Sequence, residues 1–227
     1  MNGTEVRRRR WEDTALAVLS YPANLALAGV AAFILSLGVV TWLSAAVAAG
    51  RALHRWQEHG DDAVFTQTFR EMAATWRRTW LLSVVATVLA AMVLVNLLFL
   101  GTRESPAAFL LATAMLPVAG ALLLLALMLP AAASRDRDAT TAQWLRAVVA
   151  LGAQRPISSL VLLSIVAAFG LTCVLLPTIV PFLGISLPVW LALVATGNGA
   201  GTAADQREHP ARRRLRPEGR LRRAPSA

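Results

Sequence analysis

Long stretches without charge constrain this chain more than any other feature of its sequence. Trp80 to Leu100 and Ala107 to Leu129 contain no Asp, Glu, Lys, Arg or His. One helical crossing of a bilayer needs about 20 apolar residues, so each stretch is long enough for one crossing. Ile157 to Thr196 is a longer apolar stretch that three prolines interrupt, and it predicts two crossings joined by a turn near Pro177.

The composition agrees with a membrane protein. Hydrophobic residues make up 56% of the 227 residues and charged residues only 15%, whereas soluble domains usually have about 25% charged residues. We therefore expect an all-α, polytopic transmembrane helical bundle with five to six membrane helices. Two cytoplasmic amphipathic helices and a disordered basic C-terminal tail complete the predicted architecture.

The first apolar run, Ala15 to Ala49, is too long for a cleaved signal peptide and is longer than one crossing requires. A break near Ser36-Leu37-Gly38 divides it into a first crossing and a short returning one. This hairpin keeps the arginines of the N-terminus and those of residues 50–80 on one side of the membrane. The alternative is a single crossing with an external N-terminus.

These boundaries define a basic N-terminus (1–14), one transmembrane domain (15–197) and a disordered Arg-rich tail (198–227). The predicted crossings are 16–37, 39–53, 80–100, 107–129, 157–176 and 179–197, and the predicted cytoplasmic helices are 61–79 and 141–153.

The basic residues are distributed very unevenly between the two predicted sides. All 22 are arginines, and among the predicted external turns only the one at GTRESP contains an arginine, Arg103. Loops rich in Lys and Arg stay in the cytoplasm of bacteria. The sequence therefore predicts a multi-pass protein of the bacterial plasma membrane with its C-terminus, and also its N-terminus, in the cytoplasm.

The segment 61–79 has the periodicity of an amphipathic helix. Phe65, Phe69, Met72 and Trp76 fall three or four residues apart and form an apolar stripe on an otherwise polar helix. One interpretation is that this stripe docks on a helix of a partner protein. The other is that it lies against the protein's own crossings or the lipid interface. Either Asp61 or Asp62 is expected to cap the helix.

Nothing in the sequence indicates catalysis or a cofactor. The last four predicted crossings contain no Asp, Glu, Arg or His, which argues against a proton-driven pump. His54 and His59 are five residues apart, so we interpret them with Glu58 as a solvated helix end and predict no metal site. We predict a non-enzymatic protein; the proline-interrupted crossings favour, as the alternative function, a small stand-alone transporter or channel.

The C-terminal tail combines glycine, proline and arginine without hydrophobic periodicity, which is typical of disorder. Its arginines are expected to contact anionic lipids of the inner leaflet. Nucleic acid is a less favoured partner, because no aromatic residues lie between the arginines. The arginines predicted to contact lipid are Arg212, Arg213, Arg214, Arg216, Arg220, Arg222 and Arg223.

Two segments resemble the YesL-like family of small bacterial membrane proteins. The first is SLGVVT (36–41) followed by an Ala-rich stretch and the basic GRALHRWQEHG, and the second is LRAVVALGAQRPISSLVLL. The resemblance covers about residues 16–197, although the family often has Pro where Gly38 stands here. The family has no established molecular activity, and its members often accompany ABC-type carbohydrate uptake systems. The resemblance implies that permease subunits of such a system are partners.

Overall fold

The structure is a computed structural model that describes residues 3–59 and 63–197, with side chains described from Leu19 onward. Within these ranges it is helical and contains no strand, which confirms the all-α prediction. The elements are α1 (Gly3–Ser36), α2 (Trp42–His59), α3 (Val64–Gly101), α4 (Pro106–Arg135), α5 (Thr141–Gln154), α6 (Pro156–Leu175), η1 (Pro177–Ile179) and α7 (Val180–Leu183), followed by a further helix, Ser186–Gly197.

Four of the described helices are long and apolar enough to cross a membrane: α1 from Leu19 to Ser36, α3, α4 and α6. A bent pair, Pro177–Leu183 with Ser186–Gly197, raises the number to five if it forms one crossing. Large apolar side chains remain exposed along these helices, among them Phe109 at 72% and Val174 at 77%. Surfaces of this kind need a lipid or protein partner, so the chain has the character of a multi-pass membrane protein.

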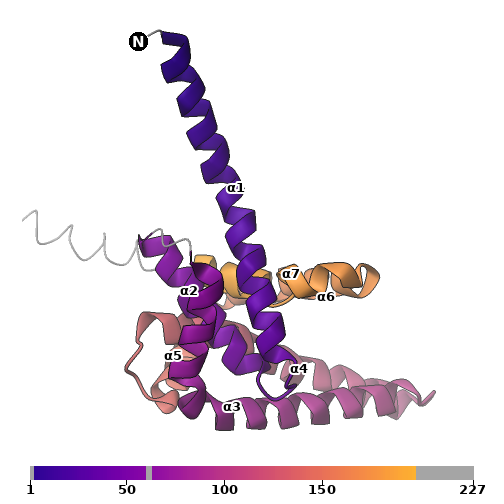
Figure 1. Cartoon of the computed structure of the whole chain (residues 1–227). Coiled ribbons are helices and arrows are strands. Elements are labelled where there is room, and N and C mark those ends of the chain that lie inside the picture. The colour runs from indigo at the N-terminus through magenta and orange to yellow at the C-terminus, as the bar shows by residue number, and fades with distance from the viewer. Residues whose placement is uncertain (1–2, 60–62, 198–227) are drawn as a thin grey trace, which may run out of the picture.

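The break predicted near Gly38 is confirmed, because α1 ends at Ser36 and α2 begins at Trp42. In the turn between them Val39 has a φ of 53°, a left-handed conformation that is unfavourable for a β-branched residue. The hydroxyl of Thr41 donates to the carbonyl of Leu35 and closes the turn. The N-terminal half of α1 extends away from the other helices (Figure 1).

The segment 39–53, predicted as a short second crossing, forms part of a buried helix in the structure. It belongs to α2, which is not among the helices apolar enough to cross. Every α2 residue from Leu43 to Leu53 is buried, and α2 packs against α1, α3 and α4. Small side chains allow these close approaches: a Cβ added at Gly50 would lie 2.8 Å from the Cβ of Pro130. Thus α2 is the central helix of the fold.

The predicted cytoplasmic helix 61–79 and the predicted crossing 80–100 are one continuous helix, α3, of 38 residues. At 1.5 Å per residue it is about 57 Å long, which exceeds the roughly 30 Å hydrocarbon core. Its N-terminal half packs on α2, and its C-terminal half forms a hairpin with α4 (Figure 1). Ala63 occupies the N-cap without a side-chain hydrogen bond, and the predicted caps Asp61 and Asp62 lie outside the described residues.

The caps of α4 and α5 agree with the sequence. Pro106 is at the start of α4, and the Ser105 hydroxyl accepts a hydrogen bond from the Ala108 amide at 3.2 Å. Thr140 forms a reciprocal capping box with Gln143 at the start of α5. The buried residues of α5 are Trp144 and Val148. The Thr140 cap lies in the α4–α5 connection, which contributes Arg137 to the charged site described below.

The last predicted crossing, 179–197, is broken in the structure. Its two helical pieces meet at a bend of 52° between Leu183 and Ser186. Pro188 lies in the first turn of the second piece, where proline is tolerated. The backbone of this region packs tightly on α1, because a Cβ added at Gly29 would overlap the carbonyl of Phe182.

Candidate functional site

The predicted docking stripe is only partly exposed. Phe65 and Phe69 are half-buried and contact each other with ring centroids 5.2 Å apart, and Trp76 is 39% exposed. Met72 is buried, so it belongs to the packing of the protein itself. Trp80 continues the exposed side at 48%. On the N-terminal half of α3 the outward apolar surface therefore consists of Phe65, Phe69, Trp76 and Trp80, and we call it the aromatic face.

The buried side of α3 is polar and was not predicted as the packing face. Thr68, Thr75 and Thr79 are almost fully buried and donate to backbone carbonyls one turn earlier on α3. The Thr79 hydroxyl also lies 2.9 Å from the hydroxyl of Ser44 on α2. Small polar residues let two helices approach closely and hydrogen-bond in an apolar environment, so the α2–α3 contact resembles a membrane helix interface.

A charge cluster lies beside this polar interface and consists of Glu71, Arg51, Arg55 and Arg137. The carboxylate of Glu71 is 3.6 Å from Nη1 of Arg51, 3.1 Å from Nη2 of Arg55 and 3.5 Å from Nη2 of Arg137. Two of these arginines come from α2 and the third from the α4–α5 connection. One acidic group thus joins three parts of the chain and leaves an excess of positive charge.

Arg51 is the most enclosed of the three arginines. Its Nε donates to the carbonyl of Ala133 at 3.1 Å, and its Nη2 donates to the carbonyl of Arg137 at 3.2 Å. Its guanidinium carbon lies 5.3 Å from the ring centroid of Trp144, whose indole N–H donates to the carbonyl of Asp136 at 2.8 Å. The cluster therefore holds the end of α4 and the start of α5 against α2.

Burial lowers the pKa of Arg51 below its ordinary value, and the charge of Glu71 acts in the opposite direction. The positive charges of Arg137 and Arg78 lower the pKa of Arg51 further. A guanidinium nevertheless remains protonated in proteins, so the charge of Arg51 is permanent and must be balanced by neighbouring groups.

Gln67 completes the surroundings of Arg55. We assign its amide with the oxygen toward the guanidinium, because this orientation accepts from Nε of Arg55 at 3.1 Å and also from Nη1. Arg55 is thereby held between Gln67 and Glu71, two residues that are one turn apart on the buried side of α3. None of the residues of this cluster was predicted as a site from the sequence.

The histidines lie next to this cluster, at the end of α2. Nε2 of His54 is 3.4 Å and Nδ1 of His59 is 4.0 Å from the Glu58 carboxylate. No group of three potential metal ligands occurs among the residues described. His54, Glu58 and His59 instead line a cavity of about 550 Å³ together with Arg55, Ser134 and Arg137.

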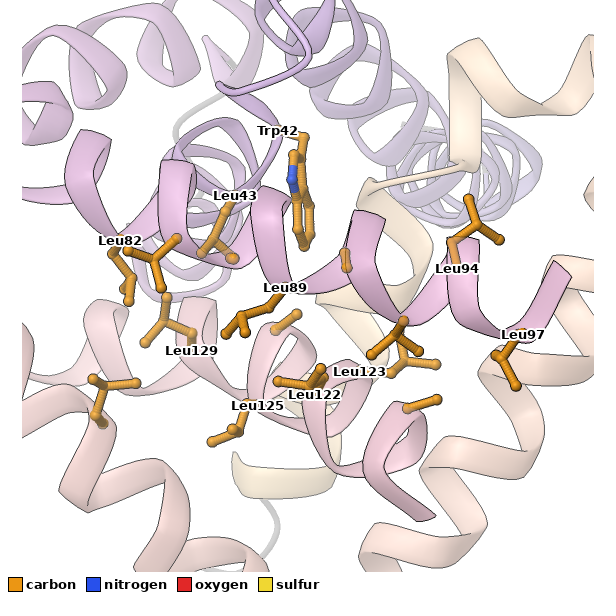
Figure 2. Close-up of a pocket in the computed structure, with 17 residues that line it drawn as sticks. Trp42, Leu43, Leu82, Leu89, Leu94, Leu97, Leu122, Leu123, Leu125 and Leu129 are labelled. Atoms are coloured by element: carbon orange, nitrogen blue, oxygen red, sulfur yellow. The ribbon is translucent and has the colours of Figure 1, made fainter. Parts of the chain in front are cut away.

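A second cavity, of about 440 Å³, is apolar and lies between α3 and α4. Figure 2 shows leucines of the two helices around it, with Trp42 of α2 at one side. The indole N–H of Trp42 donates to Thr87 at 3.0 Å, so its polar atom is already bonded. Every lining residue is apolar or aromatic, and the cavity offers no polar group to a substrate.

The arginines predicted to contact lipid, Arg212 to Arg223, lie outside the described residues. No protein-family model, curated protein or solved structure matches the chain.

Proposed function

We propose that this protein is a non-enzymatic accessory protein of the bacterial plasma membrane that docks on another integral membrane protein. The observation that carries the proposal is the orientation of α3. This helix turns Thr75 and Thr79 inward and leaves Trp76 and Trp80 on its outer side. Exposed tryptophans on the polar N-terminal half of α3 provide the large contact areas that dominate protein interfaces.

The aromatic face differs from the predicted stripe in two residues, because it lacks Met72 and includes Trp80. Met72 is buried at 8% exposure and is not available to a partner. Phe65, Phe69 and Trp76 remain at helical spacing on one side, as expected of anchors that fit the groove of a partner helix. The docking surface that we propose is therefore the aromatic face, which does not include Met72.

The partner that we propose is a permease subunit of an ABC-type carbohydrate uptake system, in line with the resemblance to the YesL-like family. The apolar cavity favours an accessory role rather than a role as a sugar-conducting pathway. No polar side chain lines the cavity to form hydrogen bonds with the hydroxyl groups of a sugar. The location of nearly all arginines on one predicted side supports a cytoplasmic position for both termini.

Site-specific photocrosslinking in native membranes tests the docking proposal. A photoreactive residue at Phe69 should crosslink to one dominant protein, identified by mass spectrometry as a permease subunit. The matched control is Ala74, which is exposed on α3 but lies away from the aromatic face. Crosslinks from Phe69 to lipid or to this chain alone, or equal capture from Ala74, would contradict docking through this face.

The second candidate is a small stand-alone transporter, and the bent pair of helices favours it. Broken helices often form substrate sites in transporters, and Ser186 is fully buried at the start of the second piece. Purified protein in liposomes should then move a solute, and Ser186→Ala should reduce the rate. An absence of flux for sugars, amino acids and ions would leave the accessory function as the better account.

A further inference from the structure

We infer that the cavity beside the charge cluster binds a phosphate-type anion. This inference is independent of the proposed docking function. Two arginines of the cluster, Arg55 and Arg137, line the cavity, together with Ser134 in the last turn of α4. Arginine is the residue best suited to hold phosphate, because its planar fork donates two parallel hydrogen bonds.

The charge balance of the cluster is the first argument. Glu71 is the only carboxylate in ion-pair contact with Arg51, Arg55 and Arg137 within the described chain. One negative charge therefore faces three permanent positive charges, and two positive charges are left without a counter-ion. Arg55 and Arg137 remain 33% and 40% exposed at the adjoining cavity, and an anion of two negative charges there would neutralise this excess.

The second argument is the hydrogen bonding of Arg137. Its Nη2 is directed to Glu71, while the side chain is 40% exposed and faces the cavity. Its guanidinium makes no other hydrogen bond to residues that the structure describes. Arg55, by contrast, is held by Gln67 and Glu71. Arg137 is thus the group with free donors, and Arg55 contributes its charge from a fixed position.

The acidic group at the cavity does not remove this positive character. Glu58 lies within 3.4 Å of His54 and 4.0 Å of His59, on the α2 side of the cavity. Among the residues that line the cavity, the two guanidinium groups of Arg55 and Arg137 outnumber the one carboxylate, that of Glu58. A volume of about 550 Å³ also leaves room for more than a bare phosphate. A phosphorylated small molecule and a lipid headgroup share this chemistry.

The first test compares two arginines that differ in position but not in charge. Saturable binding of inorganic phosphate to the full-length protein in detergent is measured by calorimetry, with chloride at equal ionic strength as the reference. Arg137→Gln should weaken binding by about tenfold or more, because a charge-assisted hydrogen bond is lost. Arg146→Gln, on the exposed side of α5, should leave it unchanged. Equal weakening by both variants would overturn the inference.

The second test separates an anion site from a purely structural cluster. Glu71→Gln removes the only counter-ion of the three arginines, so phosphate should raise the melting temperature of this variant more than that of the wild type. A structural role alone predicts a loss of stability that phosphate does not restore. If Glu71→Gln cannot be purified, the comparison of phosphate binding by Arg137→Gln and Arg146→Gln still tests the anion site.

The source of the phosphate group is determined in nanodiscs. Protein in phosphatidylcholine discs is titrated with inorganic phosphate, and a parallel sample is placed in discs that contain phosphatidylglycerol. Stabilisation by free phosphate in the first sample indicates a soluble ligand. Stabilisation only in the second, lost in Arg137→Gln and kept in Arg146→Gln, indicates a lipid headgroup. No change in either sample, or the same change in both variants, would refute the site.

Discussion

The guanidinium of Arg51 lies 3.6 Å from the carboxylate of Glu71, and the two side chains are only 6% and 9% exposed. The residues are in different helices, so this contact fixes the position of α3 on α2. The same carboxylate also contacts Arg137 beyond the end of α4. The polar groups at the centre of the fold therefore act as one unit, and they explain why α3 turns its polar side inward.

Replacing Glu71 with Met should destabilise the protein by about 3–5 kcal/mol, because Arg51 would remain buried without a counter-charge. The double variant Arg51→Met with Glu71→Met should lose less than the single variant, since no buried charge is left unpaired. Denaturant unfolding of purified protein, followed by tryptophan fluorescence, provides the measurement. Glu58→Met, at a carboxylate that is 54% exposed, serves as control and should change stability by less than about 0.5 kcal/mol.

The sequence was sufficient to predict most helix boundaries. Strong local signals specify two of these positions: Pro106 in the first turn of α4 and Thr140 at the N-cap of α5. The break after Ser36 also follows from local composition and from the length of a crossing. Such features depend on residues within one or two turns, and a single sequence contains that information.

The packing face of α3 was not predictable by the same reasoning. In a soluble helix the apolar stripe faces the core, and that rule selects Phe65, Phe69 and Trp76. Here the surroundings are apolar, so the polar residues gain more from meeting each other inside. The charge cluster was missed because its members are far apart in sequence, and only the four-residue spacing of Arg51 and Arg55 on α2 gave a local signal.

Replacing Thr79 with an apolar residue of the same shape should destabilise the protein less than replacing it with a larger residue. Its side chain is fully buried at the contact with Ser44. Thr79→Val keeps the shape and loses hydrogen bonds, and such bonds between membrane helices contribute about 0.6 kcal/mol on average. Thr79→Leu inserts extra volume and should cost about 1–3 kcal/mol. Unfolding in mixed micelles measures both, and equal losses would contradict a tight α2–α3 interface. Val88→Leu, at a position that is 53% exposed, is the size control.

Gly29 should not accept any side chain. A Cβ at this position would overlap the backbone carbonyl of Phe182, and backbone cannot move aside as a flexible side chain can. Gly29→Ala should therefore separate α1 from α7 and lower the melting temperature by several degrees. Gly170→Ala is the matched control, because nothing lies within 4 Å of its Cβ position; there the substitution should stabilise α6 by about 0.5–1 kcal/mol. A similar effect of both substitutions would contradict the close approach.

The two connections of α4 should lie on opposite sides of the membrane, because α3 and α4 each cross it once. Arg103→Cys, in the α3–α4 turn, should react with a membrane-impermeant maleimide added to intact cells. Asp138→Cys, in the α4–α5 connection, should react only after permeabilisation. Both positions are exposed, and Cys173→Ala removes the one native cysteine from the background. Labelling of both cysteines from outside would show that the hairpin does not span the bilayer. Labelling of Asp138→Cys alone would invert the sidedness that the arginine distribution predicts.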